Sequence, residues 1–223
     1  MDRRTLLALL AASTATGMSS LPRWAWAQPK LPANPFTLGV ASGSPRHDSV
    51  VLWTRLHSTS VFGGNLIPQQ AITVHWDVAQ DEAFTKMIQT GTANALPELG
   101  HAVHVELHHL SPDSWYFYRF KVGDYISTIG RTRTFAALDS ALTPHSRLRF
   151  AYASCQRWES GYYSAYSHML KEQLDVIVFL GDYIYEYNSR GKTAVRTLPT
   201  HLPAFTENID SYRMRYAAYK SDA

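Results

Sequence analysis

The stretch Ala71-Ile72-Thr73-Val74-His75-Trp76-Asp77-Val78-Ala79 alternates between apolar and polar side chains. Ile72, Val74, Trp76 and Val78 fall on one face of an extended chain, and Thr73, His75 and Asp77 fall on the other. Because successive side chains of a β-strand point to opposite faces, this alternation predicts a strand with one buried face. The stretch therefore indicates a sheet that packs against a core.

Similar short runs lie on both sides of this strand. They cover residues 50–56, 87–93, 101–107, 115–122 and 131–135. Turn residues separate them, among them Gly63-Gly64, Leu99-Gly100 and Ser111-Pro112-Asp113. Short strands at this spacing are typical of a β-sandwich, so we predict a sandwich domain over residues 36–138.

One segment sharpens the type of sandwich. Leu110-Ser111-Pro112-Asp113-Ser114-Trp115-Tyr116 resembles the tyrosine corner of fibronectin-type sandwiches. In that motif a tyrosine hydroxyl forms a hydrogen bond with the backbone just upstream. We expect Tyr116 to have this structural role.

The pattern changes after residue 138. Residues 139–147 are polar and predict a boundary, and apolar runs follow at 148–153 and 176–180. Between the two runs, apolar side chains at spacings of three and four predict a helix over 161–174, with Tyr162, Tyr166, Met169 and Leu170 on one stripe. Continuous apolar runs are typical of strands buried on both faces of a parallel sheet, so residues 148–180 are predicted to form a β-α-β unit.

A second helix is expected over residues 209–219, with Ile209, Tyr212, Tyr216 and Tyr219 on one stripe. We interpret residues 148–223 as the start of an α/β domain. Two strands lack neighbours and one helix cannot cover both faces of a sheet, so this domain is expected to be incomplete and, alone, poorly folded and inactive.

The first 27 residues have the features of an export signal. Arg3-Arg4 precedes an apolar run at 6–12, and Ala25-Trp26-Ala27 is a small-x-small cleavage signal. The paired arginines resemble a twin-arginine signal, which implies the twin-arginine export machinery as a partner and a periplasmic or secreted location. The apolar run is too short to span a bilayer, so no transmembrane segment is expected. Residues 28–35 are predicted to be a linker.

Composition excludes other classes of protein. Apolar residues make up 45% of the chain and charged residues 17%, which supports a packed core rather than disorder. The net charge is +3, and the first 27 residues supply +2 of it, from Arg3, Arg4 and Arg23 less Asp2. A nearly neutral body offers no basic patch for nucleic acid.

The residues with reactive or ligating side chains follow the two strands of the β-α-β unit. Cys155 comes after the first strand and Asp182 after the second, and ligands bind at the carboxyl ends of parallel strands. Tyr185 is three residues beyond Asp182 and could turn back to the same point. Cys155 is the single cysteine of the chain, so it cannot form an internal disulfide. Thiolate, carboxylate and phenolate suit Fe³⁺ better than Zn²⁺, and a bridging carboxylate suits a second cation.

The motifs at these positions resemble those of PhoD alkaline phosphatases. They are Gly39-Val40-Ala41-Ser42-Gly43, Ser49-Val50-Val51-Leu52-Trp53-Thr54-Arg55-Leu56, Ala153-Ser154-Cys155-Gln156, Leu180-Gly181-Asp182-Tyr183-Ile184-Tyr185-Glu186-Tyr187 and Tyr212-Arg213-Met214-Arg215-Tyr216-Ala217. The resemblance covers roughly residues 36–220 and implies an extracytoplasmic hydrolase of phosphomonoesters and phosphodiesters. It further implies that Cys155, Asp182 and Tyr185 bind Fe³⁺ and that Asp182, the catalytic residue, bridges to Ca²⁺. The family's other ligands would lie beyond Ala223.

Three alternatives stay open at this point. A purple acid phosphatase shares the Gly-Asp-x-x-Tyr motif but carries aspartate where this chain has Cys155. A secreted, non-enzymatic sandwich module would bind a partner and no metal. A thiol hydrolase would use Cys155 with a histidine in reach.

Other polar residues have simpler interpretations. His101, His104, His108 and His109 could form a zinc site, but a solvated face is the expected arrangement, with His104 and Glu106 on the outer side of a strand. Arg157 and His168, on either side of Cys155 in the chain, are expected on a surface loop and a helix surface, with phosphate contact as the alternative for Arg157.

Overall fold

The computed structural model describes residues 30–58, 67–137, 147–188 and 194–222. The predicted export signal, the Gly63-Gly64 turn and nearly all of the predicted boundary at 139–147 lie outside these ranges. Residues Leu31–Ala223 form one compact unit, and the description below concerns this unit by itself.

The first sheet of the sandwich has three antiparallel strands. Their order is β1 (Val40–Gly43), β2 (Val50–Arg55) and β5 (Ala102–Leu107). In β2 and β5, alternate apolar side chains are buried, and Leu52 pairs with Val105 across the ladder. The predicted strands at 50–56 and 101–107 are confirmed, whereas β1 was missed because its sequence, Val-Ala-Ser-Gly, has no apolar run or alternation.

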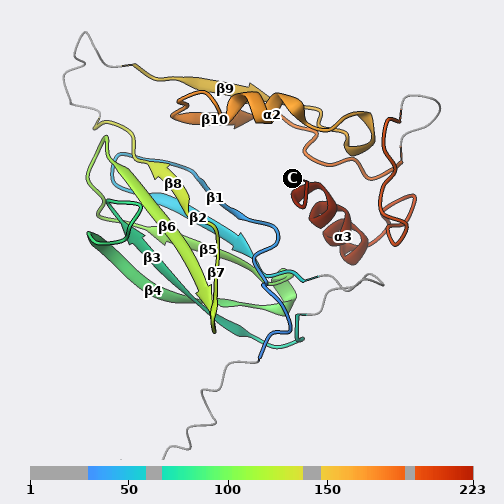
Figure 1. The fold of residues 1–223 in the computed structure, drawn as a ribbon, viewed down its shortest axis with the longest axis horizontal. Coiled ribbons are helices and arrows are strands. Elements are labelled where there is room, and N and C mark those ends of the chain that lie inside the picture. The colour runs from blue at the N-terminus through green and yellow to red at the C-terminus, as the bar shows by residue number, and fades with distance from the viewer. Residues whose placement is uncertain (1–29, 59–66, 138–146, 189–193, 223) are drawn as a thin grey trace, which may run out of the picture. The chain divides into compact units, whose positions relative to one another are not determined.

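The second sheet has five strands and is also antiparallel. Its path is β4 (Met87–Ala95), β3 (Ile72–Ala79), β6 (Trp115–Val122) and β7 (Tyr125–Ile126), and β8 (Gly130–Arg133) also pairs with β6. A 3-10 turn, η2 (Pro97–Leu99), leads from β4 to β5. The opening stretch thus forms the inner strand β3, with a neighbour on each side (Figure 1).

The apolar faces of the two sheets form one core. Leu52, Ile72, Val74, Val78 and Phe120 are fully buried within it. Leu31, inside the predicted linker, is 5% exposed and belongs to the same cluster. This arrangement is a fibronectin-like β-sandwich, as the strand spacing predicted.

Tyr116 forms the tyrosine corner expected from the sequence. The backbone N–H of Ser111 donates to the Tyr116 hydroxyl over 2.8 Å, and the Tyr116 side chain is 1% exposed. The bond ties the turn before β6 to the strand itself.

Asp77 lies on the face of β3 predicted to be polar, yet it is 4% exposed. Arg119 Nε and Lys121 Nζ, on the paired strand β6, each lie 2.8 Å from Asp77 Oδ2. Burial by itself would raise the pKa of Asp77, but bonds to Lys121 and Arg119 hold it below its ordinary value. Ion pairing therefore explains why a carboxylate is buried at this position.

The β-α-β unit is confirmed. Strands β9 (Phe150–Ala153) and β10 (Val176–Phe179) pair in parallel, and α2 (Ser164–Met169) connects them after the 3-10 turn η3 (Trp158–Ser160). In Figure 1 this segment is drawn in yellow and orange.

Helix α2 is shorter than the predicted 161–174. Tyr163 has a φ of 53°, which an α-helix does not accommodate, so the helix begins at Ser164. At its other end Lys171 N and Glu172 N bond to the carbonyls three residues back, a 3-10 pattern that ends the α-helix. Tyr162 and Leu170, predicted on the apolar stripe, are 66% and 87% exposed.

Helix α3 (Ile209–Lys220) is confirmed, but its buried face differs from the predicted one. Asn208 caps it through a bond from Ser211 N, and the Ser211 hydroxyl accepts in return from Asn208 N. Of the predicted stripe, Tyr219 is buried at 4% exposure, but Ile209 is 63% exposed, and Arg215, outside the stripe, is fully buried. Arg215 Nη2 donates to Pro203 O and Asn188 Oδ1, contacts that residue spacing could not reveal.

None of the helices in the described ranges is long and apolar enough to cross a membrane.

Candidate metal centre

Two loops at the carboxyl end of the β9–β10 sheet form the candidate site. The β ladder continues past the strands through backbone bonds from Leu180 N to Ala153 O, from Cys155 N to Gly181 O and from Gln156 N to Asp182 O. Their lengths are 2.8, 3.1 and 3.2 Å. The residue after each strand end is thus held beside its counterpart, as the parallel topology predicted.

The chain turns sharply at both loops. Cys155 has a φ of 57° and Asp182 a φ of 51°, in the left-handed region that side chains other than glycine seldom occupy. Such strain persists only where surrounding contacts hold it, and it is common at functional sites. Here the turns direct the thiol and the carboxylate toward each other.

Cys155, Asp182 and Tyr185 meet at a single oxygen. Cys155 Sγ donates to Asp182 Oδ2 over 3.4 Å, and the Tyr185 hydroxyl donates to the same Oδ2 over 3.1 Å. Cys155 and Asp182 are exposed, whereas Tyr185 is half-buried. The structure therefore brings the three side chains singled out from the sequence into one cluster.

The electrostatics of this cluster favour a cation. Partial burial, and then the neighbouring Asp182 and Cys155, raise the pKa of Tyr185 to about 12. Without a positive charge the phenol keeps its proton, because a phenolate beside a carboxylate would be repelled. A bound cation reverses this preference, since it stabilises all three anionic forms.

The donor set fits a metal ion but does not complete its coordination. Across the described ranges, no group of three or more His, Cys, Asp or Glu side chains that could hold a metal is present. The cluster instead has two such side chains and a phenol. The four histidines near β5 were expected to form a solvated face, with a zinc site as the alternative. His104 is exposed as expected, but His101 is 1% exposed, so the prediction is wrong for His101. The two side chains lie in different environments, which gives the zinc alternative no support.

Gln156 links the two loops and was missed in the sequence. Its Nε2 donates to Tyr183 O over 2.8 Å, and its Oε1 accepts from the Tyr166 hydroxyl of α2 over 2.8 Å. Gln156 therefore fixes the loop of Cys155 to the loop of Asp182. Its place directly after Cys155 was the available signal.

Arg157 lies against the cluster rather than on a free surface loop. Its guanidinium carbon is 4.0 Å from the Tyr185 ring centroid and 4.7 Å from that of Tyr187. Arg157 Nη1 also donates to Tyr187 O over 3.2 Å. This cation–π stacking orients the ring whose hydroxyl reaches Asp182.

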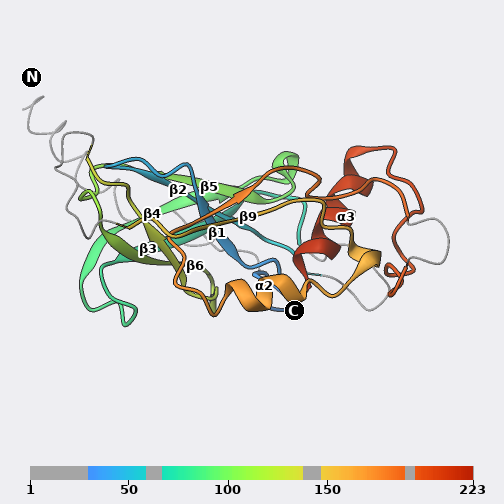
Figure 2. The same ribbon diagram turned by 90° about the horizontal axis from the view of Figure 1, so that it is seen from above.

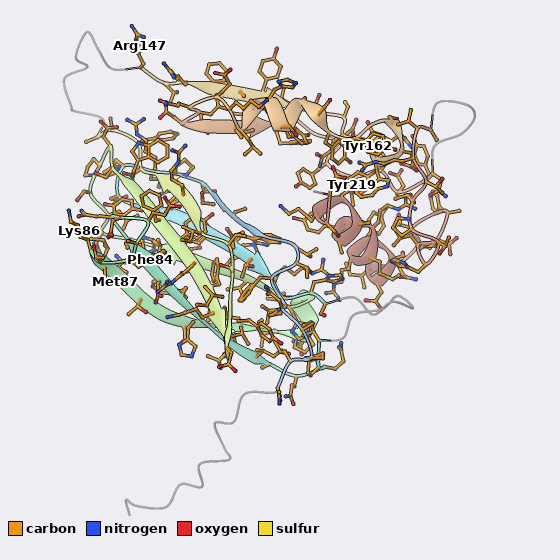
Figure 3. All side chains as sticks on the ribbon, in the orientation of Figure 1. Phe84, Lys86, Met87, Arg147, Tyr162 and Tyr219 are labelled. Atoms are coloured by element: carbon orange, nitrogen blue, oxygen red, sulfur yellow. The ribbon has the colours of Figure 1, made fainter. Side chains whose placement is uncertain are left out.

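Helix α3 supports the second loop from outside the sheet. Tyr185 N donates to the Tyr219 hydroxyl over 3.4 Å, and the Tyr183 ring stacks on Tyr216 with centroids 5.8 Å apart. Figure 3 labels Tyr219 on α3 and Tyr162 on the segment that precedes α2, and both ribbon views draw α3 near the loops that follow β9 and β10 (Figures 1 and 2). Tyr183 thus packs toward α3 and away from Asp182.

The geometry bears on the thiol-hydrolase alternative. The side chain in contact with Cys155 Sγ is the carboxylate of Asp182, and His168 is exposed on α2. A thiol hydrolase needs a histidine in reach of its thiol, and the contact made here with a carboxylate does not support that alternative.

A fibronectin-like sandwich followed by a parallel β-α-β unit with oxygen and sulfur side chains at its carboxyl end defines a two-domain class of β-sandwich plus α/β proteins. The family comparisons agree with it. Residues 23–136 match the model of the PhoD-like phosphatase N-terminal domain, and residues 150–223 match that of the PhoD-like phosphatase. The chain belongs to the PhoD-like phosphatase family.

Two relatives give the scale of the similarity. The chain is 49% identical over 200 residues to alkaline phosphatase D of Bacillus subtilis (strain 168), a match that covers 88% of this chain and 33% of that protein. It superimposes on a solved structure of PhoD with a TM-score of 0.75 and 48% identity, over 87% of this chain and 37% of the other. The chain thus spans about a third of the length of the relatives that it matches.

Proposed function

We propose that the complete protein containing this chain is an exported, metal-dependent phosphoric ester hydrolase of the alkaline phosphatase D type. In this proposal Cys155, Asp182 and Tyr185 hold Fe³⁺, and Asp182 also contacts Ca²⁺. The substrates are phosphomonoesters and phosphodiesters, in keeping with the similarity to alkaline phosphatase D.

One observation carries the proposal. Two proton donors, the Cys155 thiol and the Tyr185 hydroxyl, converge on Asp182 Oδ2. When both donors lose their protons, the same arrangement presents three anionic ligands to one point. Such ligands suit a trivalent cation, and this set has no imidazole nitrogen of the kind that zinc usually takes.

The chain's own residues prepare the site for phosphoryl transfer. A bound pair of cations would supply Lewis acidity and offset the charge that develops on the phosphoryl oxygens. Asp182 gathers the ligands, Gln156 fixes the distance between the two loops, and Arg157 orients the Tyr185 ring. The Arg157 guanidinium also adds a positive charge beside the place where a phosphate ester would bind.

The test uses the complete protein with iron and calcium supplied. A phenolate bound to Fe³⁺ absorbs visible light, so the protein is expected to be coloured, and Tyr185→Phe is expected to lose the band. The variant should also lose phosphatase activity by at least about tenfold, since even residues that merely support metal ligands cost this much when changed.

Tyr187→Phe is the matched control. Tyr187 shares the stacking contact with Arg157, but the hydroxyl that reaches Asp182 belongs to Tyr185. The control is expected to keep both colour and activity. A colourless protein without bound iron would overturn the iron–phenolate assignment, and inactivity as well would favour a binding module.

Export has its own test. Changing Arg3 and Arg4 together to lysine preserves the charge but removes the arginine pair. We expect the precursor to accumulate in the cytoplasm, as measured by fractionation and immunoblotting. Normal export of this variant would rule out the twin-arginine route, and an ordinary secretory signal would replace it.

A further inference from the structure

A cavity of about 430 Å³ lies between the sandwich and helix α3. From the sandwich side it is lined by Arg55, His57 and His101, and from the other side by His201, Arg213 and Ser221. Cys155, Asp182 and Tyr185 are not among its lining residues. We call it the α3 cavity. Its volume is within the range of sites that bind small molecules.

Two guanidinium groups are packed against one turn at the wall of the α3 cavity. Arg55, 8% exposed, donates from Nε to Gly100 O over 2.9 Å and from Nη1 to Arg213 O over 3.3 Å. Arg213 contacts the same turn so closely that a Cβ on Gly100 would lie 2.9 Å from Arg213 Nε. The charges of the two arginines are therefore held near each other.

Acidic side chains compensate this charge only weakly. Asp210 lines the cavity and lies 3.5 Å from Arg213, but its side chain is 81% exposed and hence well hydrated. The charge of Glu98, in the turn before His101, only partly opposes the lowering of the His101 pKa by burial. Burial, and then the neighbouring Arg213, lower the pKa of Arg55, as expected for a buried cation beside a like charge. The α3 cavity thus has the electrostatic character of an anion site.

His101 is one of the lining residues and has an unpartnered ring atom. It is 1% exposed, and within the described part of the chain its Nε2 has no hydrogen-bond partner. Its Nδ1 lies 3.3 Å from Ala95 O, a carbonyl that can only accept, so Nδ1 carries the proton and Nε2 keeps a lone pair. Burial lowers the pKa of His101, which keeps the ring neutral.

His57 has the same tautomer as His101, with its proton on Nδ1. Thr37 uses its hydroxyl proton on His57 O at 2.9 Å, so it accepts from His57 Nδ1 at 3.3 Å. Burial, Arg55 and His201 lower the pKa of His57 to about 4. The lining of the α3 cavity therefore combines guanidinium groups with two imidazoles that burial keeps neutral.

We propose that the α3 cavity binds a hydrogenphosphate group, separate from the metal centre. The unprotonated oxygens would accept from Arg55 and Arg213, and the P–OH group would donate to His101 Nε2. A carboxylate or sulfate has no proton to donate at neutral pH, so it would leave the buried nitrogen unpaired. Inorganic phosphate keeps a P–OH group at neutral pH, whereas a phosphate monoester, with a second pKa of about 6, is mostly a dianion without one. Inorganic phosphate is therefore the expected ligand.

The experiment removes the metal centre from the measurement. The complete protein with Asp182→Asn, freed of metal by chelation, is titrated calorimetrically at neutral pH with inorganic phosphate, glycerol 3-phosphate and sulfate. Saturable binding of inorganic phosphate, with sulfate at least about tenfold weaker, is expected. Glycerol 3-phosphate, which at neutral pH is mostly a dianion without a P–OH group, is expected to bind more weakly than inorganic phosphate. No binding, or equal binding of sulfate, would overturn the proposal.

Two variants locate the site. Arg213→Gln is expected to weaken phosphate binding about tenfold, and His101→Phe to remove the preference over sulfate. Arg131→Gln is the matched control, because Arg131 is exposed, stacks on Trp115 and does not line the α3 cavity. Unchanged phosphate affinity in Arg213→Gln would overturn the assignment.

Folding is checked by thermal melting of each variant without ligand. If Arg213→Gln melts early, Arg213→Lys keeps the charge but loses the planar donor pair, and it must still weaken binding. No catalysis enters these measurements, so they stand or fall independently of the proposed iron site.

Discussion

The sandwich and the β9–α2–β10 unit both contain apolar strand sequence, but they differ in burial. Every residue of the core cluster comes from the part of the chain between Leu31 and Val122. In β9, α2 and β10 no residue is fully buried. Large side chains of the two strands are instead exposed, among them Phe150 at 60%, Tyr152 at 66% and Ile177 at 56%.

The difference shows what a strand signal means physically. In the sandwich each sheet covers the apolar face of the other, so the alternation along β3 is satisfied within the domain. A parallel sheet needs layers on both faces, and here a single six-residue helix accompanies two strands. The apolar pattern of a strand determines which of its side chains can be buried. Whether they are buried depends on a second layer of secondary structure that packs on that face.

The largest expected effect tests this contrast directly. Leu52 is fully buried in β2, so Leu52→Ala removes packed methyl groups and leaves a cavity. We expect it to lower the free energy of unfolding by about 2–5 kcal/mol. Ile177→Ala, in exposed β10, is expected to change it by less than about 0.5 kcal/mol. Urea denaturation of this chain, followed by far-UV circular dichroism, measures both.

Equal costs at the two positions would break the comparison. That result would mean that β10 is covered in solution by another layer or another molecule. A large effect of Leu52→Ala alone would confirm that the sandwich carries the stability of this chain.

Much of the fold could be predicted because its signals are local. The alternation over β3 and the tyrosine corner at Tyr116 each depend on neighbouring residues in the chain. The ends of α2 could not be predicted, because the left-handed conformation of Tyr163 is a property of the folded backbone. The buried face of α3 was predicted only in part, at Tyr219. Arg215 was missed because it is buried by partners such as Pro203 that only tertiary structure brings near.

The candidate site shows the same division. Topology alone placed Cys155 beside Asp182, because parallel strands end at one edge of a sheet. Tyr185 followed from its spacing. The roles of Gln156 and Arg157 depend on the directions of their side chains, which the spacing of residues in the sequence does not reveal. The contacts that hold the ligands were therefore harder to predict than the ligands.

Asp77 offers an intermediate effect within the sandwich. Asp77→Asn leaves Arg119 and Lys121 without their shared partner, but their side chains are 28% and 34% exposed and can be hydrated. We expect a loss of about 1–2 kcal/mol near neutral pH. Because the folded-state pKa of Asp77 is lowered, its contribution is complete above the ordinary carboxyl range and is lost as pH falls through the folded-state pKa.

Chemical denaturation at several pH values tests this. The difference between the original chain and Asp77→Asn should shrink steadily as the pH is lowered below about 4. Asp124→Asn, at an exposed position, is the control and should show little difference at any pH. A gap that stays constant with pH would mean that the Asp77 charge does not stabilise the sheet.

The smallest effect concerns single hydroxyl groups at the edge of the sandwich. Tyr116→Phe removes the acceptor of Ser111 N, a bond of 2.8 Å that belongs to a fully buried side chain. The expected loss is about 1 kcal/mol, since the freed N–H is near the surface and can be hydrated. Tyr125→Phe removes a contact of 3.5 Å from the Tyr125 hydroxyl to Leu31 O and should cost much less. Urea denaturation measures both losses of unfolding free energy. If Tyr125→Phe cost more than Tyr116→Phe, the contact with Leu31 would stabilise the sandwich more than the tyrosine corner does. The stable part of the chain would then extend further toward its beginning than the strands do.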